Sequence, residues 1–163
     1  MIFLVGMMGV GKTTVGRLLA ERLGVRYCDS DAQVVANTGM TVPEIFSSRG
    51  EAAFRAEEKR ALAEAAQGDP AVVAVAGGAV LDPDNRKLLR ESGTVVWLRA
   101  TLETMATRVG RGTGRPLLGD DPAAALAALY PQREPLYAEV ADIVVDVDDA
   151  RPEDVVEQIA AAL

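Results

Sequence analysis

Residues 6–13 are Gly6-Met7-Met8-Gly9-Val10-Gly11-Lys12-Thr13, a complete match to the phosphate-binding pattern G-x-x-x-x-G-K-[ST]. An apolar run of strand length, residues 2–5, precedes the motif, and an amphipathic helical pattern, residues 12–23, follows it. In such a strand–loop–helix unit, successive backbone N–H groups point inward and the helix N-terminus adds positive potential. The sequence therefore predicts a P-loop that binds the phosphates of a nucleotide.

The two polar residues that end the motif have distinct predicted roles. Lys12 reaches the β- and γ-phosphates as a point charge, and Thr13 offers its hydroxyl to Mg²⁺. A glycine-rich turn that only caps a helix is the alternative, but strand, spacing, Lys-Thr pair and helix are all present. We therefore predict ATP as phosphoryl donor and Mg²⁺ as its metal, with nucleotide contacts from Gly9, Val10, Gly11, Lys12, Thr13 and Thr14.

Apolar runs of strand length alternate with segments of helical periodicity along the chain. Strands separated by helices need crossover connections, so this order predicts a parallel sheet covered on both faces. We expect a single domain, residues 1–163, with a three-layer α/β/α P-loop NTPase fold and five parallel strands. The expected strands are residues 2–5, 25–28, 71–76, 94–98 and 142–145, and the expected helices are residues 12–23, 31–38, 42–48, 51–67, 83–91, 102–109, 122–130 and 152–163.

Two segments do not follow either periodicity. Residues 111–121 are rich in Gly, Arg and Pro. Residues 130–135 contain two prolines, Pro131 and Pro135. We expect both to be irregular, and we expect residues of about 110–121 to form a lid, because long irregular loops in compact domains are often functional.

Composition excludes several classes of function. The net charge of −7 disfavours a nucleic-acid partner, which needs surplus Lys and Arg. The sequence has no histidine, so imidazole is neither base nor metal ligand, and the single cysteine, Cys28, excludes an intramolecular disulfide. No apolar stretch approaches ~20 residues. We expect a cytoplasmic protein, with no membrane partner, that acts as a monomer.

The third expected strand distinguishes among P-loop proteins. GTPases and oligomeric ATPases commonly carry an Asp at the end of that strand, whereas this strand is followed by Gly77-Gly78. The guanine-reading pattern Asn-Lys-x-Asp is also missing from the sequence. Carboxylates instead follow the second strand, at Asp29 and Asp31, which favours a small-molecule kinase.

Asp29 and Asp31 come at the carboxyl end of the second strand, where open α/β sheets bind ligands. They can serve a metal's water shell and a substrate hydroxyl; alternatively, Ser30 or Asp31 only caps the following helix. Arg55 likewise has two interpretations, because pairing with Glu51 and Glu58 on the surface of a helix explains it without any function.

Taken together, these features resemble the shikimate kinase family along essentially the whole chain. The resemblance rests on an ordered set of motifs rather than on the P-loop alone. The set is the P-loop helix from Gly6 to Ala20, Asp29-x-Asp31, Phe54-Arg55 with Glu57-Glu58, Gly77-Gly78, Arg115-Pro116-Leu117-Leu118 and Arg133-x-x-x-Tyr137. It implies a nucleoside-monophosphate-kinase-like fold with a mobile lid, and transfer of the γ-phosphate of MgATP to the 3-hydroxyl of shikimate.

The resemblance also implies roles for individual residues, with the acceptor-binding region at about residues 31–60. Asp31 would hold the acceptor hydroxyl as the candidate base, and Asp29 would order the magnesium shell through water. Arg55, Arg133 and the backbone of Gly77 and Gly78 would bind shikimate, with Glu58 orienting Arg55. Further implied contacts are apolar walls from Phe46, Phe54, Pro116 and Leu117, the catalytic and nucleotide-binding lid residue Arg115 on the transferring phosphoryl group, and Arg108 against the adenine.

Two positions depart from the family pattern. Ala76 stands where a first glycine is common, which leaves the shape of the pocket open, and Arg151 lies one position later than a usual adenine-contacting arginine. Two alternative functions also remain. One is a kinase of another small hydroxy acid such as gluconate. The other is a nucleotide-binding regulator without turnover, whose signature would be the loss of Lys12, Thr13, Asp31 or Arg115, and all four are present.

Overall fold

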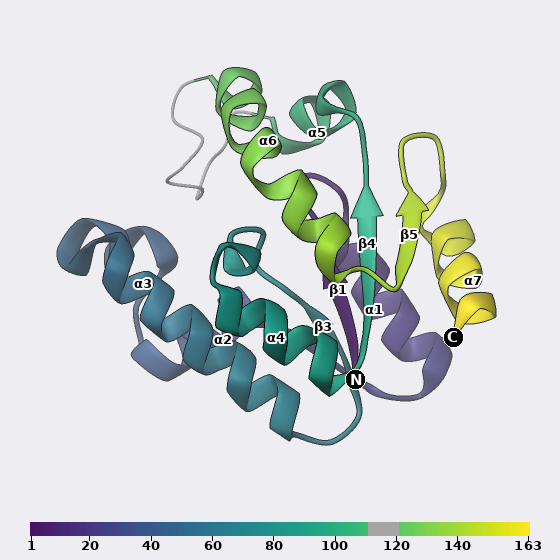
Figure 1. Cartoon of the computed structure of the whole chain (residues 1–163), viewed down its shortest axis with the longest axis horizontal. Coiled ribbons are helices and arrows are strands. Elements are labelled where there is room, and N and C mark those ends of the chain that lie inside the picture. Colours follow the sequence, from purple (N-terminus) through teal and green to yellow (C-terminus); the bar gives the residue numbers. More distant parts are fainter. Residues whose placement is uncertain (111–120) are drawn as a thin grey trace.

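The computed structural model describes residues 1–110 and 121–163, and their centre is a five-stranded sheet (Figure 1). All strand pairs are parallel, in the order β2-β3-β1-β4-β5. The predicted parallel sheet is therefore confirmed, with end points that differ by up to two residues. The strands are β1 (Ile2–Val5), β2 (Arg26–Asp29), β3 (Ala71–Ala74), β4 (Thr94–Arg99) and β5 (Ile143–Asp146).

Helices cover both faces of the sheet. In Figure 1, α4 and α6 lie in front of the strands and α1 lies behind them, where it packs against α7. Among the described residues, no helix has the length and apolarity needed to cross a membrane. The helices are α1 (Lys12–Leu23), α2 (Ser30–Thr38), α3 (Val42–Gln67), α4 (Pro83–Ser92), α5 (Leu102–Val109), α6 (Pro122–Val140) and α7 (Pro152–Ala162), with a short 3₁₀ helix η1 (Ala79–Leu81).

The three central strands carry the hydrophobic core. Phe3 and Leu4 of β1, Val72 of β3 and Val96 of β4 are all fully buried. Strands covered on both faces read as continuous apolar runs, which is why these segments showed no alternation in the sequence. A second, smaller apolar cluster joins α2 to α3 through Val34, Ile45, Phe54 and Ala61.

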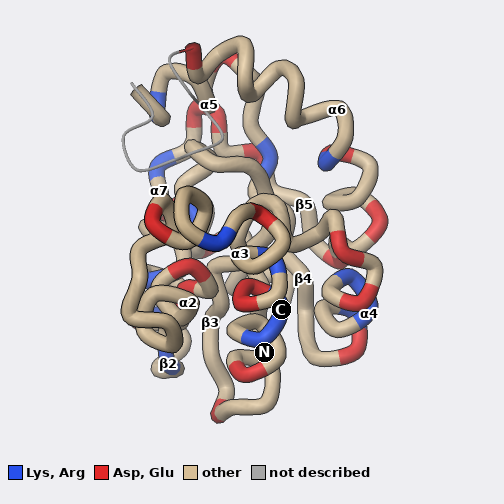
Figure 2. The backbone as a smooth tube through the Cα atoms, turned by 90° about the vertical axis from the view of Figure 1, so that its left-hand side faces the viewer, with Lys and Arg blue, Asp and Glu red and all other residues tan. Residues whose placement is uncertain are grey.

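The surface of the helices carries both signs of charge. Basic and acidic residues are interspersed along α3 and α4 (Figure 2), and Lys59 of α3 pairs with Asp82 and Asp84 at the start of α4. Exposed ion pairs of this kind contribute little to stability, so apolar burial is its main source.

Helix α3 consists of two helical segments that meet at Gly50. The backbone of Gly50 has φ 80° and ψ 173°, values that glycine adopts without steric cost. The first segment begins with a capping box between Thr41 and Glu44. The sequence prediction of two separate helices, residues 42–48 and 51–67, agrees with this break.

The prediction for residues 130–135 was wrong. The helix that was expected to end at residue 130 continues as α6 to Val140, with Pro131 and Pro135 inside it. Proline weakens a helix by removing an N–H donor and crowding the preceding turn, but burial of one helical face can outweigh this cost. In α6 the buried residues are Leu126, Arg133, Tyr137 and Val140.

Strand β5 joins the sheet through a side chain as well as through its backbone. Asp142 N–H donates to Val95 O at 2.9 Å, and the Asp142 carboxylate Oδ2 accepts from Val95 N–H at 2.8 Å. The carboxylate thus continues the hydrogen-bond pattern one residue ahead of β5, which starts at Ile143 rather than at the predicted residue 142.

Replacing Asp142 by Ala should lower the free energy of unfolding by about 1–3 kcal/mol, because the N–H of the buried Val95 loses its acceptor. Urea denaturation measures this change. The matched control is Asp142→Asn, which keeps an acceptor oxygen and should lose less. Equal stability of the Ala variant and the unaltered protein would contradict a structural role for this contact.

Candidate active site

A cavity of about 590 Å³ opens at the carboxyl edge of the sheet. The loops after β1, β2 and β3 all contribute to its wall, as expected for parallel strands. Among the residues that sequence analysis singled out, the cavity is lined by Gly9, Gly11, Lys12, Thr13, Thr14, Asp29, Asp31, Phe46, Phe54, Arg55, Glu58, Gly77, Gly78, Arg108 and Arg133.

The remaining predicted residues do not line the cavity or cannot be placed. Val10 is 2% exposed and packs in the hydrophobic core, so only its backbone is available for a nucleotide. Arg115, Pro116 and Leu117 lie outside the described residues, as does most of the expected lid.

The P-loop closes around the head of Lys12. Lys12 Nζ donates to Gly6 O at 2.8 Å and to Met7 O at 2.9 Å. Gly6, Gly9 and Gly11 have φ of 138°, 87° and 93°, so the loop needs glycine at these three points. The spacing of the motif thus produces a curved backbone with the ammonium group beside it, the arrangement that binds phosphates.

The cap of α2 differs from the alternative that was considered from sequence. Asp29, rather than Ser30 or Asp31, caps α2: its Oδ1 accepts from Asp31 N–H at 3.0 Å and from Ala32 N–H at 3.3 Å. Ser30 is buried, and its hydroxyl oxygen accepts from Ala76 N–H at 2.9 Å, which ties the end of β2 to the end of β3. Asp31 lines the cavity.

Tyr27 is not on the cavity wall, but it supports Asp29, which is, and sequence reasoning missed it. Its hydroxyl donates to Asp29 Oδ2 at 3.2 Å, and its ring packs against Gly16 of α1. Burial, together with the negative charge of Asp29, raises the pKa of Tyr27 to about 12, so the hydroxyl stays protonated at neutral pH. The sequence did contain a signal for this contact. Residues two apart in a strand point to the same side, so Tyr27 and Asp29 of β2 are expected to be neighbours.

The donor set near the P-loop fits Mg²⁺. Thr13 and Asp29 are oxygen donors on the wall of one cavity. Within the described residues, no group of three or more Asp, Glu, Cys or His side chains is placed to hold a metal by itself. Mg²⁺ commonly takes only one or two protein oxygens and completes its shell with phosphates and water, so this sparse set suits a nucleotide-bound magnesium.

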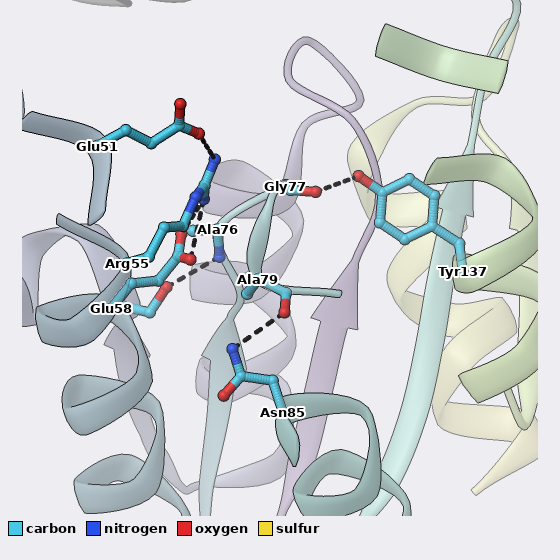
Figure 3. A network of polar contacts seen from close by, with 9 residues as sticks. Glu51, Arg55, Glu58, Ala76, Gly77, Ala79, Asn85 and Tyr137 are labelled. Atoms are coloured by element: carbon cyan, nitrogen blue, oxygen red, sulfur yellow. Dashed lines mark hydrogen bonds and ion pairs between the residues drawn. The ribbon is translucent and has the colours of Figure 1, made fainter. Parts of the chain in front are cut away.

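On the opposite wall, Arg55 is held by acidic partners from its own helix (Figure 3). Arg55 Nη1 donates to both carboxylate oxygens of Glu58, at 2.9 and 3.0 Å, and Nη2 donates to Glu51 at 3.2 Å. The surface pairing considered from sequence is therefore present, yet Arg55 also faces the cavity and Glu58 is buried. Arg133 reaches the same cavity from α6 and is itself only 2% exposed.

Arg108 of α5 lines the cavity and is held by the loop after β5. Its Nη2 donates to Val147 O at 2.7 Å and to Asp148 O at 3.0 Å, so the loop after β5 fixes the guanidinium. Arg151 instead pairs with Asp154 on the surface, with its side chain 76% exposed, and it is not part of the cavity wall.

The comparisons with known proteins agree with this geometry. The family model described as shikimate kinase matches residues 8–163. The chain belongs to the shikimate kinase family. Family members are ATP-dependent phosphotransferases, so the predictions of the family and of a P-loop kinase are confirmed.

Individual shikimate kinases are similar over nearly the full chain. The shikimate kinase of Halorhodospira halophila is 48% identical over 163 residues, which cover 99% of this chain and 92% of that protein. The structure of the Acinetobacter baumannii shikimate kinase in complex with shikimate has a TM-score of 0.96 at 40% identity, covering 99% and 90% of the two chains. A gluconokinase from Sinorhizobium meliloti has a TM-score of 0.61 at 23% identity, covering 98% and 89%, and this likeness shows the fold alone.

The buried carboxyl of Glu58 predicts a pH dependence of stability. Burial raises the pKa of Glu58 to about 7, although the ion pair with Arg55 acts in the opposite direction. Between the ordinary pKa of 4.5 and 7, the folded state therefore binds more protons than the unfolded state. Protonation of Glu58 therefore contributes to the free energy of unfolding. The contribution is fully present below pH 4.5 and is lost as the pH rises through about 7.

Urea denaturation at several pH values should show this effect as a difference between the unaltered protein and Glu58→Gln. Relative to the variant, the unaltered protein should lose on the order of 2 kcal/mol of stability between pH 4.5 and 7.5. Glu51→Gln, which removes the exposed partner of the same arginine, is the matched control. A constant difference between protein and Glu58→Gln across this range would contradict the raised pKa.

Proposed function

We propose that this chain transfers the γ-phosphoryl group of MgATP to the 3-hydroxyl of shikimate, giving shikimate 3-phosphate and ADP. The observation that supports it best is one cavity that joins a P-loop to a carboxylate and to two arginines from separate helices, Arg55 of α3 and Arg133 of α6. Shikimate carries both groups that such a cavity recognises, a carboxylate and ring hydroxyls. Membership in the shikimate kinase family supports the same substrate.

At the donor end, the P-loop amides and Lys12 bind the β- and γ-phosphates, and Arg108 contacts the adenine. Thr13 would hold Mg²⁺ directly, and Asp29 would do so through a water. The metal, when bound with ATP, neutralises negative charge on the phosphates. The hydrogen bonds from Tyr27 and from the N–H of Asp31 hold the Asp29 carboxylate in one orientation, so it is positioned before the metal binds.

At the acceptor end, Asp31 accepts the proton of the attacking hydroxyl, and the guanidinium groups of Arg55 and Arg133 bind the carboxylate from two sides. Glu58 keeps Arg55 in place through two hydrogen bonds. Phosphoryl transfer depends mainly on positioning and charge stabilisation, and this arrangement supplies both. The resemblance to the family further implies that Arg115, in the expected lid, binds the phosphoryl group during its transfer.

Two other functions are weaker. A gluconate kinase shares the fold and must also bind a carboxylate. The gluconokinase, however, is 23% identical to this chain, whereas the two shikimate kinases described above are 40% and 48% identical. A nucleotide-binding regulator has no need of Asp31 and two arginines beside the phosphate site.

We further infer that the enzyme acts as a monomer in the cytoplasm, on small molecules and without a nucleic acid or membrane partner.

A coupled assay that measures ADP release, with shikimate and gluconate at equal concentration, tests the proposed function. ADP release should depend on shikimate, on ATP and on Mg²⁺, and Lys12→Ala should abolish it. Preference for gluconate would replace the proposed substrate, and ATP binding without ADP release would favour a regulator.

Replacing Asp31 by Asn should lower kcat by about 10²–10⁴-fold, because the acceptor hydroxyl loses its base. The KM for ATP should change little, since the phosphates are bound by the P-loop. Steady-state kinetics with each substrate varied in turn measures both values. A loss in ATP affinity as large as the loss in kcat would instead place Asp31 at the metal or in the structure.

A further inference from the structure

The turn that follows β3 has a defined geometry. Residues 76–79 form it, with Ala79 N–H donating to Ala76 O at 3.0 Å. Gly78, the third residue of the turn, has φ −91° and ψ −9°, the values of a type I β-turn. The peptide between Gly77 and Gly78 is the middle peptide of this turn and takes no part in its closing hydrogen bond.

The sequence of the turn permits a second geometry. Type I and type II turns differ mainly by a rotation of the middle peptide of about 180°, and type II needs a residue that tolerates positive φ at the third position. Glycine tolerates it at no steric cost. Gly78 is therefore compatible with either orientation of the middle peptide, so a contact from outside the turn can favour one of them.

Tyr137 of α6 makes that contact (Figure 3). Its hydroxyl donates to Gly77 O at 2.6 Å, and its ring is fully buried, 5.9 Å from the ring of Trp97 between centroids. Burial raises the pKa of Tyr137 above its usual range, so the hydroxyl retains the proton that it donates. This bond is available only when the Gly77 carbonyl points toward α6.

The direction of the Gly77 carbonyl sets the direction of the next N–H. In a trans peptide the C=O and N–H groups point in opposite directions, so Gly78 N–H points away from α6. Arg55 lies on that side of the turn in Figure 3, and a Cβ on Gly78 would stand 2.7 Å from Arg55 Nη2. None of the hydrogen bonds found among residues 1–110 and 121–163 has Gly78 N–H as its donor.

We propose that Tyr137 is a positioning residue for the acceptor. Its hydroxyl holds the turn in the type I form, so that Gly78 N–H faces the cavity beside Arg55, where it donates to the bound acid. Tyr137 itself is not on the cavity wall, whereas Arg133, one helical turn earlier in α6, is. Helix α6 thus serves acceptor binding twice, directly through Arg133 and indirectly through Tyr137. This inference rests on the proposed function.

Tyr137→Phe tests the inference, because it removes the hydroxyl and keeps the ring. The KM for shikimate should rise roughly 5- to 10-fold, the effect of one hydrogen bond to the acceptor, while the KM for ATP stays within about 2-fold. The matched control is Tyr130→Phe on the same helix, whose hydroxyl bonds to Glu134 at 3.0 Å rather than to the turn. The control should change neither KM.

Different outcomes separate the possible failures. An unchanged KM for shikimate in Tyr137→Phe, or equal rises in both KM values, would overturn the positioning role and leave the proposed function intact. An unaltered protein that does not phosphorylate shikimate would instead overturn the proposed function.

A measurement on the unaltered protein keeps the inference testable if Tyr137→Phe does not fold. In ¹⁵N-labelled protein, the Gly78 amide resonance should shift when shikimate is added without nucleotide. A Gly78 resonance that stays in place while shikimate binds would overturn the inference.

Discussion

All five strands run in the same direction, and therefore every loop that follows a strand leaves the sheet at one edge. The order β2-β3-β1 places three of these loops side by side: the P-loop after β1, the residues around Asp29 and Asp31 after β2, and the turn of residues 76–79 after β3. The amides of the P-loop, the two carboxylates and the turn of residues 76–79 meet there as a consequence of topology. The helices add Arg55, Arg108 and Arg133 from the sides of the same edge.

The site is held in shape by hydrogen bonds between these loops and their neighbours, rather than by the loops alone. Ser30 joins the end of β2 to Ala76, and Asn85 of α4, which is buried, donates to Ala79 O at 3.0 Å. Together with Tyr137, these side chains form hydrogen bonds with the backbone of residues 76–79 from three helices, α2, α4 and α6. Buried hydrogen bonds of this kind fix one geometry, because leaving either partner unpaired is costly.

Helix α6 shows how packing can outweigh local preference. Two internal prolines indicate a break, yet a continuous helix brings Arg133 and Tyr137 to one face, four residues apart. With a break at residues 130–135, the helix would not hold these two side chains on one face. Burial of one face of α6 therefore explains why the helix continues through its prolines. The same face brings Arg133 to the cavity wall.

The sequence alone determined the P-loop, the parallel sheet, the resemblance to the family and most of the described residues that line the cavity. These features depend on contacts between residues close in the chain or on periodic burial, and both leave local patterns. Only the tertiary structure decided that Asp29 caps α2, that α6 continues through its prolines and that Tyr137 holds Gly77, 60 residues away in the chain. Such choices depend on which distant segments pack together, because burial and hydrogen-bond partners are supplied by the whole fold rather than by neighbouring residues.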